Sequence, residues 1–242
     1  GFALGNAVGD GNGFANWLLW SHGASITDEG GQVSVNSPQT IQALNYLKEL
    51  YPTFVDGGTV SWGDISNNQA YAASTCWVTS NGVSLYFALK NDPATRAIAD
   101  DTEHSELPHG VAGSWPSAPL TLNAMVFKHS RYPNAAKALL AFLMEQEQYE
   151  PWLGANLGYW AHPLNNYRNS AVWSTDPKIE IFRDSMNNRF WNGYKGPLNE
   201  AAGQAANEYV LVQMCASVAS GQATPEAAAR EAERRARRIY RR

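Results

Sequence analysis

The sequence lacks the long apolar run of a membrane-spanning helix and the excess of basic residues typical of nucleic-acid-binding proteins. Its apolar stretches all fall short of the ~20 residues needed to cross a bilayer. The formal net charge is −4, which argues against nucleic acid as the main partner. No basic segment followed by an apolar one stands at the start, and Gly1 opens the chain without Met. We therefore expect a chain that was processed or cut from a longer one.

Cysteine is scarce, and the histidines are scattered. Cys76 and Cys215 lie far apart without metal-ligand spacing, so we expect two buried free thiols in preference to a disulfide. The five histidines form no His-Glu-x-x-His motif. The sequence also has no Gly-x-Ser-x-Gly elbow and no Gly-Lys-Ser/Thr phosphate loop. These absences predict neither a metal site nor a cofactor.

Aromatic side chains are what the chain has in number, with nine Trp and eleven Tyr. Hydrophobic residues make up 44% and charged residues 17%, which is the composition of an ordered globular protein. Its 242 residues suffice for one large domain or two small ones. Aromatic rings bury well and also stack on the faces of sugars, so they serve either a core or a ligand site.

Helical and strand patterns alternate along the chain. Ser37 followed by Pro38 predicts a capped helix that Pro52 ends. We expect a Gly-rich turn at 9–13 and strands at 32–36, 75–79 and 120–127. Further helices are expected at 14–20, 65–74, 83–90, 200–220, and from 133, 176 and 224. This alternation predicts an α/β architecture with its ligand crevice in the loops beyond the strand ends.

Four segments, in this order, carry a family resemblance. Residues 18–51 hold a Trp-Ser helix, a turn, a Val-x-Val-Asn-Ser strand and an Ala-Leu helix. Residues 62–70 place an acidic turn before a small-residue helix, and residues 133–143 form a Pro-x-x-Ala helix that ends in Phe-Leu. Residues 221–238 form a closing helix of small and charged residues. Together they resemble the extracellular solute-binding proteins of ABC importers, the family that includes the maltose-binding protein.

The resemblance implies a periplasmic binding protein-like (type II) lobe, an α/β fold with a mixed sheet flanked by helices. Residues 1–115 would form the first part of the C-terminal lobe, and residues 156–242 its second part. Residues 116–155 would be the crossover strand and helix that the family packs on its first lobe. That first lobe should precede Gly1 and is absent. The helix from Pro133 is expected to bury a face formed by Ala136, Leu139, Leu140, Leu143 and Met144.

The implied function is solute binding for an ABC importer, without catalysis. The solute would be small and polar, most readily a sugar, held in a cleft between two lobes that close over it. The partners would be that solute and the permease subunits in the membrane, and the protein would act as a periplasmic or extracellular monomer. The implied ligand-binding residues are Asp10, Asn12, Trp17, Asn81, Tyr86, Trp115, Asn123, Tyr159, Trp160, Glu208 and Tyr209.

Each of these assignments has a structural alternative. Asp10 and Asn12 could simply bond their own turn, and Glu208 could be a solvated helix charge. The aromatic loops at 159–160 and 191–194 could be packing under loops. The seven arginines of the last helix could form a solvent-exposed face in which Glu231 and Glu233 are interleaved. Alternatively, they could form a binding surface for an anionic partner.

Other functions also stay open. Asp10 and Glu208 could form the carboxylate pair of a carbohydrate-active enzyme, although nothing in the sequence sets their separation. The solute could equally be a polyol or a polyamine bound by the same fold. A structural or interaction domain that uses the Arg-rich helix would bind anionic partners in a salt-sensitive way.

Overall fold

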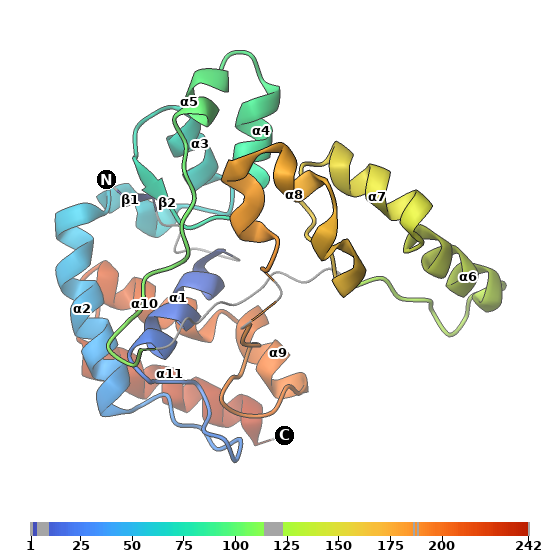
Figure 1. Cartoon of the computed structure of the whole chain (residues 1–242). Coiled ribbons are helices and arrows are strands. Elements are labelled where there is room, and N and C mark those ends of the chain that lie inside the picture. The colour runs from blue at the N-terminus through green and yellow to red at the C-terminus, as the bar shows by residue number, and fades with distance from the viewer. Residues whose placement is uncertain (1, 4–9, 114–122, 186, 188, 242) are drawn as a thin grey trace. The chain divides into compact units, whose positions relative to one another are not determined.

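The computed structural model describes residues 2–3, 10–113, 123–185, 187 and 189–241. The chain divides into two compact units (Figure 1). Unit 1 consists of Gly1–Asn81, Leu107–Pro119 and Asn188–Arg242, and unit 2 of Gly82–Glu106 and Leu120–Asn187.

Helices dominate both units. Unit 1 contains β1 (Phe2–Ala3), α1 (Asp10–Ser21), α2 (Pro38–Phe54), η1 (Gly57–Ser61), α3 (Ser66–Ala72), β2 (Val78–Thr79), α9 (Glu200–Asn207), α10 (Val210–Ala219) and α11 (Pro225–Tyr240). Unit 2 contains α4 (Ser84–Asn91), α5 (Arg96–Asp100), α6 (Pro133–Leu143), α7 (Gln146–Ala155), η2 (Asn165–Asn169), α8 (Val172–Thr175) and η3 (Pro177–Phe182).

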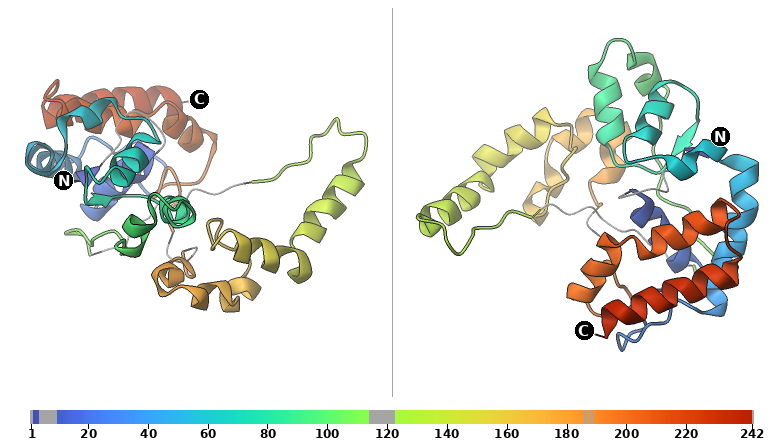
Figure 2. Two further views of the ribbon diagram at one scale, coloured as in Figure 1. Left: turned by 90° about the horizontal axis from the view of Figure 1, so that it is seen from above. Right: turned by 180° about the vertical axis from the view of Figure 1, so that it is seen from behind.

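The core of unit 1 is made by α1, α2, α10 and α11. Leu18 of α1 and Leu44 of α2 are completely buried in it. The buried face of α11 is mostly alanine: Ala228, Ala229, Ala232 and Ala236. Because alanine is small, α11 approaches α10 closely, and the two helices lie side by side in both views (Figures 1 and 2). This packing fixes the elements that carry several of the expected site residues.

Helix starts are where the sequence predictions succeed best. Ser37 caps α2, accepting a hydrogen bond from the backbone N–H of Thr40 at 3.2 Å. Thr224 caps α11 in the same way. Pro52 does not end α2, which continues to Phe54. Pro52 has no backbone N–H to donate within the helix, but its ring fixes φ near −65°, which is compatible with the last turn of α2.

The strand predictions are largely wrong for the described residues. The sheet found among them is β1 paired in parallel with β2, with Phe2 opposite Val78. The expected buried strand 75–79 reduces to β2, and Trp77 is 84% exposed. Segment 32–36 contributes one antiparallel bridge, Val33 to Thr27. Of the strand expected at 120–127, residues 123–127 are not in a strand and the rest lie outside the described residues.

Four helix predictions also need correction. The described part of the Gly-rich turn, from Asp10, belongs to the first turn of α1, where an acidic residue suits the helix dipole. The helix expected at 200–220 is broken by Tyr209, which has φ 54° and ψ 39°. The segment after Asp176 is a 3₁₀ helix, although Asp176 caps it as expected. Among the described residues, helix α6 has no buried residue, so the face expected to be buried, Ala136, Leu139, Leu140, Leu143 and Met144, is partly or fully exposed.

Unit 2 packs around aromatic and aliphatic side chains from α7, η2, α8 and η3. Leu153 and Ile179 are completely buried, and Trp173 nearly so. Gly158, with φ 70°, lies against the Trp173 ring, and a Cβ there would be 2.6 Å from the ring carbon Cζ3. Only glycine fits this turn without displacing the indole.

Both cysteines are buried free thiols, which confirms the expectation. Burial raises the pKa of the Cys215 thiol to about 12. Among the described residues, every helix is too short or too polar to cross a membrane.

Candidate functional site

The first turn of α1 meets the end of α9 in unit 1. The side-chain amide of Asn12 donates to the backbone carbonyl of Ala206 at 3.2 Å. The amide of Asn16 in turn donates to the Asn12 carbonyl at 2.9 Å. Asn12 therefore lies beside the segment that leads into Glu208 and Tyr209, although the two segments are far apart in the sequence. Two of the expected ligand-binding segments converge here.

Glu208 and Tyr209 separate α9 from α10, and we call these two residues the α9–α10 break. The Glu208 carboxylate accepts a hydrogen bond from Gln204 Nε2 at 2.7 Å, and Arg238 Nη2 lies 3.8 Å from it. Its side chain is 36% exposed. A carboxylate held in this way keeps acceptor positions for hydroxyl groups or an ammonium group. Tyr209 occupies the left-handed region, a conformation that is often found at functional sites.

A small hollow adjoins this place. It is lined by Asn12, Asn16, Ile26, Asn192, Gly193, Ala202, Ala205, Ala206 and Leu211. The free space is about 10 Å³, which is room for about one water molecule. This dimple, lined by three asparagines and by small or apolar residues, is too small to enclose a sugar by itself.

Asn81 follows β2 and is tied to α3. Its amide donates to the side-chain oxygen of Asn68, and the amide of Asn67 donates to Thr79 Oγ1 at 3.1 Å. Asn81 is half-buried. These amides secure the end of β2 to the start of α3.

The two tryptophans of α1 are core residues of unit 1. Trp17 is 8% exposed, and its indole N–H donates to the Pro108 carbonyl at 3.1 Å. Trp20 donates to the Tyr194 carbonyl at 3.3 Å and packs edge-on against Phe190 and Tyr194. Neither indole face is open for stacking. Phe190 and Tyr194 stack on each other at 3.8 Å, so the 189–196 loop matches the loop-packing alternative.

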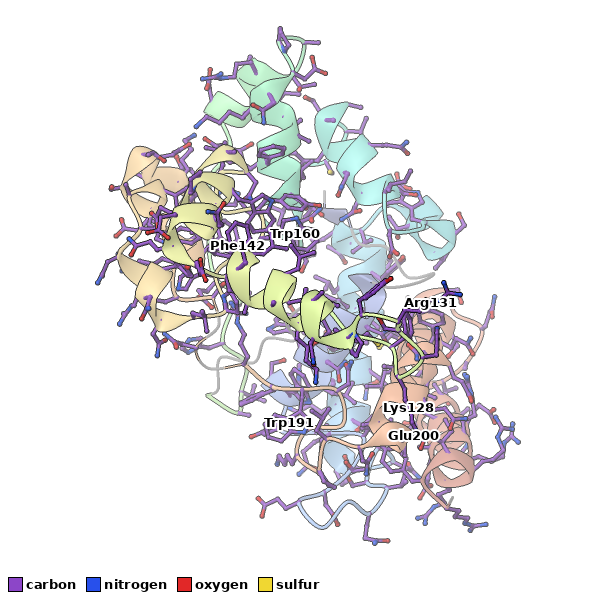
Figure 3. All side chains as sticks on the ribbon, turned by 90° about the vertical axis from the view of Figure 1, so that its right-hand side faces the viewer. Lys128, Arg131, Phe142, Trp160, Trp191 and Glu200 are labelled. Atoms are coloured by element: carbon purple, nitrogen blue, oxygen red, sulfur yellow. The ribbon has the colours of Figure 1, made fainter. Side chains whose placement is uncertain are left out.

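The remaining described candidates belong to unit 2. Tyr86 is buried, and its hydroxyl donates to Asp176 Oδ2 at 2.6 Å, so it is a core group here. Tyr159 and Trp160 (the latter labelled in Figure 3) are half-buried and meet edge to face at 4.7 Å. Phe87 of α4 packs against Tyr159. Asn123 is exposed. Trp115 and the side chain of Asp10 lie outside the described residues.

A polar network in unit 2 escaped the sequence predictions. The Asp176 carboxylate accepts hydrogen bonds from Tyr86 and Lys90, and Lys178 Nζ donates to the carbonyls of Asp100 and Thr102. His104 Nδ1 lies 2.9 Å from the Lys178 carbonyl, and burial lowers the pKa of this imidazole. Of this network, the sequence pattern indicates only that Asp176-Pro177 starts a helix. Nothing in the pattern around Lys90 indicates a partner 86 residues away.

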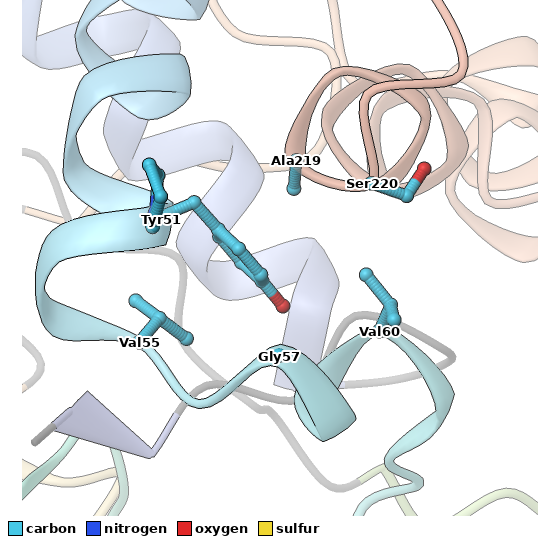
Figure 4. Close-up of a pocket in the computed structure, with 7 residues that line it drawn as sticks. Tyr51, Val55, Gly57, Val60, Ala219 and Ser220 are labelled. Carbon is cyan, nitrogen blue, oxygen red and sulfur yellow. The ribbon is translucent and has the colours of Figure 1, made fainter.

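A larger hollow in unit 1 is not lined by any of the expected site residues. It measures about 410 Å³ and is bounded by Tyr51, Pro52, Val55, Gly57, Val60, Ala219 and Ser220 (Figure 4). The part of the chain that the structure describes contains no cluster of three or more His, Cys, Asp or Glu side chains able to hold a metal ion.

The chain is similar in sequence to known proteins. Residues 2–181 match the family model described as bacterial extracellular solute-binding protein. A probable ABC transporter-binding protein of Deinococcus radiodurans is 28% identical over 134 residues, which is 54% of this chain and 31% of that protein.

Solved structures agree in fold. A sugar transporter from Arthrobacter chlorophenolicus A6 with bound laminaribiose superposes with a TM-score of 0.72 at 16% identity, covering 98% of this chain and 59% of its own. Maltose-bound T. maritima MalE3 gives a TM-score of 0.66 at 19% identity, covering 93% of this chain and 56% of its own. The fold is therefore that of periplasmic binding proteins of the maltose-binding type, and this chain spans less than two thirds of either structure. By the family match over residues 2–181, the chain belongs to the bacterial extracellular solute-binding proteins.

Proposed function

We propose that this chain supplies one wall of the solute site of an ABC importer's binding protein. The observation that carries the proposal is the convergence of Asn12 with the α9–α10 break. This contact brings the Asn12 amide to the end of α9, next to the segment that carries a partly exposed carboxylate and a tyrosine, and groups of these kinds suit a small polar solute. Such a surface needs an opposing wall to enclose the solute.

The uncovered face of α6 supports an opposing lobe. Leu139, Phe142 and Leu143 are 56%, 45% and 48% exposed. A helix with such apolar side chains in water is normally covered by further protein. The matched structures are longer than this chain. We infer that sequence outside the 242 residues provides the lobe that packs on residues 116–155 and faces the wall described above.

A sugar is the solute that we propose first. The chain is similar in fold to proteins whose structures hold laminaribiose and maltose. Carboxylate and amide groups bind sugar hydroxyls, and an aromatic ring such as that of Tyr209 stacks on sugar faces. Closure of the two lobes over the sugar would give the form that docks on the permease at the outer face of the membrane. No step of this cycle requires catalysis.

Titration calorimetry of the full-length protein tests the proposal. The panel comprises mono- and disaccharides, polyols and polyamines. We expect saturable binding of a sugar, and expect Glu208→Gln and Asn12→Ala each to weaken it, because each removes a polar contact. Glu49→Gln on α2 and Asn91→Ala at the end of α4 are the matched controls, since both side chains are exposed.

The outcomes separate the candidate solutes. If only a polyamine binds, the proposed role in an ABC importer still holds, but the solute is a cation that pairs with Glu208 and not a sugar. A folded protein that binds nothing in the panel would contradict the proposal. Release of reducing sugar from an oligosaccharide, lost in Glu208→Gln, would favour the enzyme alternative.

A further inference from the structure

We propose that Arg235 of α11 is a positioning residue that holds the α9–α10 break and thereby sets where Glu208 lies. The inference rests on the proposed function at one point, the assignment of Glu208 to the solute site. Its structural part, that Arg235 holds the break, stands on contacts within unit 1 alone.

The α9–α10 break needs a stabilising contact, because the sequence of residues 200–220 favours a continuous helix. Residues 200–220 read as one continuous helix, rich in alanine and other helix-forming residues. Tyr209 instead has φ 54°, where its Cβ crowds the backbone. Glycine or asparagine would be the usual residue in this conformation. A contact from outside the α9–α10 segment must therefore favour the broken form.

Arg235 contacts the break itself and α10 beyond it. One guanidinium nitrogen, Nη2, donates to the backbone carbonyl of Glu208 at 2.7 Å. The other, Nη1, donates to the side-chain oxygen of Gln213, one turn into α10. The rigid fork of arginine spans two acceptors in this way, which a lysine ammonium on a flexible stem does not reproduce. The Glu208 carbonyl follows the last turn of α9, where backbone carbonyls lack helical partners.

The neighbouring arginines of α11 are different. Arg234 pairs with Glu231 at 2.6 Å, and Arg237 with Glu233 at 2.7 Å, both within α11 and with exposed arginine side chains. Arg238 lies 3.8 Å from the partly exposed Glu208 carboxylate, and its own side chain is exposed. Such surface pairs contribute little and weaken in salt. Arg235 binds two uncharged acceptors, so its effect should persist in salt.

The consequence for the site is geometric. Arg235 fixes the Glu208 carbonyl, and Gln204 fixes the carboxylate of the same residue at 2.7 Å. With both ends of Glu208 held, the carboxylate is oriented before the solute arrives, which lowers the ordering cost of binding. The sequence presents Arg235 as one of seven arginines, and only its contacts distinguish it.

Hydrogen exchange on the full-length protein tests the structural part. The reporters are the amides of Glu208, Tyr209 and Gln213, which bond to the carbonyls of Gln204, Ala206 and Tyr209. We expect Arg235→Gln to speed their exchange by about tenfold or more, because a charge-assisted hydrogen bond is lost. Arg234→Gln removes the same charge from the same helix and should change them by less than about twofold. Arg235→Lys should give only partial protection, and it serves as the second variant should Arg235→Gln not fold.

Solute affinity tests the positioning part. In Arg235→Gln the affinity should fall several-fold, and a Gln213→Ala background should reduce that effect, since the two side chains act through one contact. Unchanged exchange in Arg235→Gln overturns the proposal. Faster exchange with unchanged affinity overturns the positioning role and leaves the proposed function standing. If the wild-type protein binds no solute, the proposed function fails, and the exchange result still decides whether Arg235 holds the break.

Discussion

Gly110 lies where the 107–113 segment crosses the end of α1. A Cβ built there would be 2.1 Å from the Ser21 carbonyl oxygen, a backbone atom that cannot swing aside. Gly110→Ala should therefore destabilise the protein by about 1–3 kcal/mol, the usual cost of overpacking. Gly63→Ala is the matched control, since a Cβ at Gly63 meets nothing within 4 Å. Denaturant unfolding of both variants checks this; equal stability would show that α1 has room to move.

The Asp176 carboxylate of unit 2 is buried and accepts hydrogen bonds from Tyr86 and Lys90. Burial by itself would raise its pKa, yet hydrogen bonds from Lys90 and Tyr86 outweigh burial and lower the pKa to about 2. Because this lies below the ordinary value of 3.8, the carboxylate stabilises the fold fully above pH 3.8. That stability is lost as the pH falls toward 2.

Asp176→Asn should consequently cost about 1.5–3 kcal/mol near neutral pH, because Lys90 and Tyr86 lose a charged acceptor. The difference from wild type should shrink as the pH approaches 2. Asp100→Asn is the control in the same unit: both side chains of its pair with Arg96 are exposed, and the pair should contribute at most about 1 kcal/mol. Unfolding curves across this pH range measure both, and a constant Asp176→Asn difference down to pH 2 would contradict the assignment.

At the scale of elements, caps are local and can be tested singly. Ser37→Ala removes the acceptor for the Thr40 amide and should cost about 1 kcal/mol. Ser61→Ala, which deletes an exposed hydroxyl bonded to the Gly58 carbonyl, should stay within about 0.5 kcal/mol. Thermal unfolding compares the two variants, and equal losses would mean that the Ser37 cap is not what stabilises α2.

Those caps also show what a sequence can predict. Ser37-Pro38 and Thr224-Pro225 specify helix starts by short-range chemistry, and both were read correctly. The α9–α10 break could not be predicted from the sequence, because the residue that contacts it, Arg235, lies in another helix. The strand at 75–79 had the right composition, but a strand forms only where a partner is present. For the site, the convergence of Asn12 with Ala206 depends on tertiary packing that no local pattern encodes.

At the scale of the whole molecule, the stability of α6 variants tests whether an opposing lobe covers the apolar face of α6. Leu143→Glu should destabilise the full-length protein by about 1.5–3 kcal/mol if the opposing lobe covers this face. Ala141→Glu, on the opposite side of α6 by helical spacing and exposed, should have little effect. Denaturation of the full-length variants measures the difference. A Leu143→Glu protein as stable as wild type would show that the face stays in water.

The central claim is that the surface joining Asn12 to the α9–α10 break is a wall of the solute site. Hydrogen exchange of the full-length protein, with and without the best-binding solute, tests it most directly. We expect the solute to slow exchange of backbone amides at 10–16 and 206–213, where α1 and the break meet. Solute-dependent protection confined to other segments, with these amides unchanged, would contradict the account.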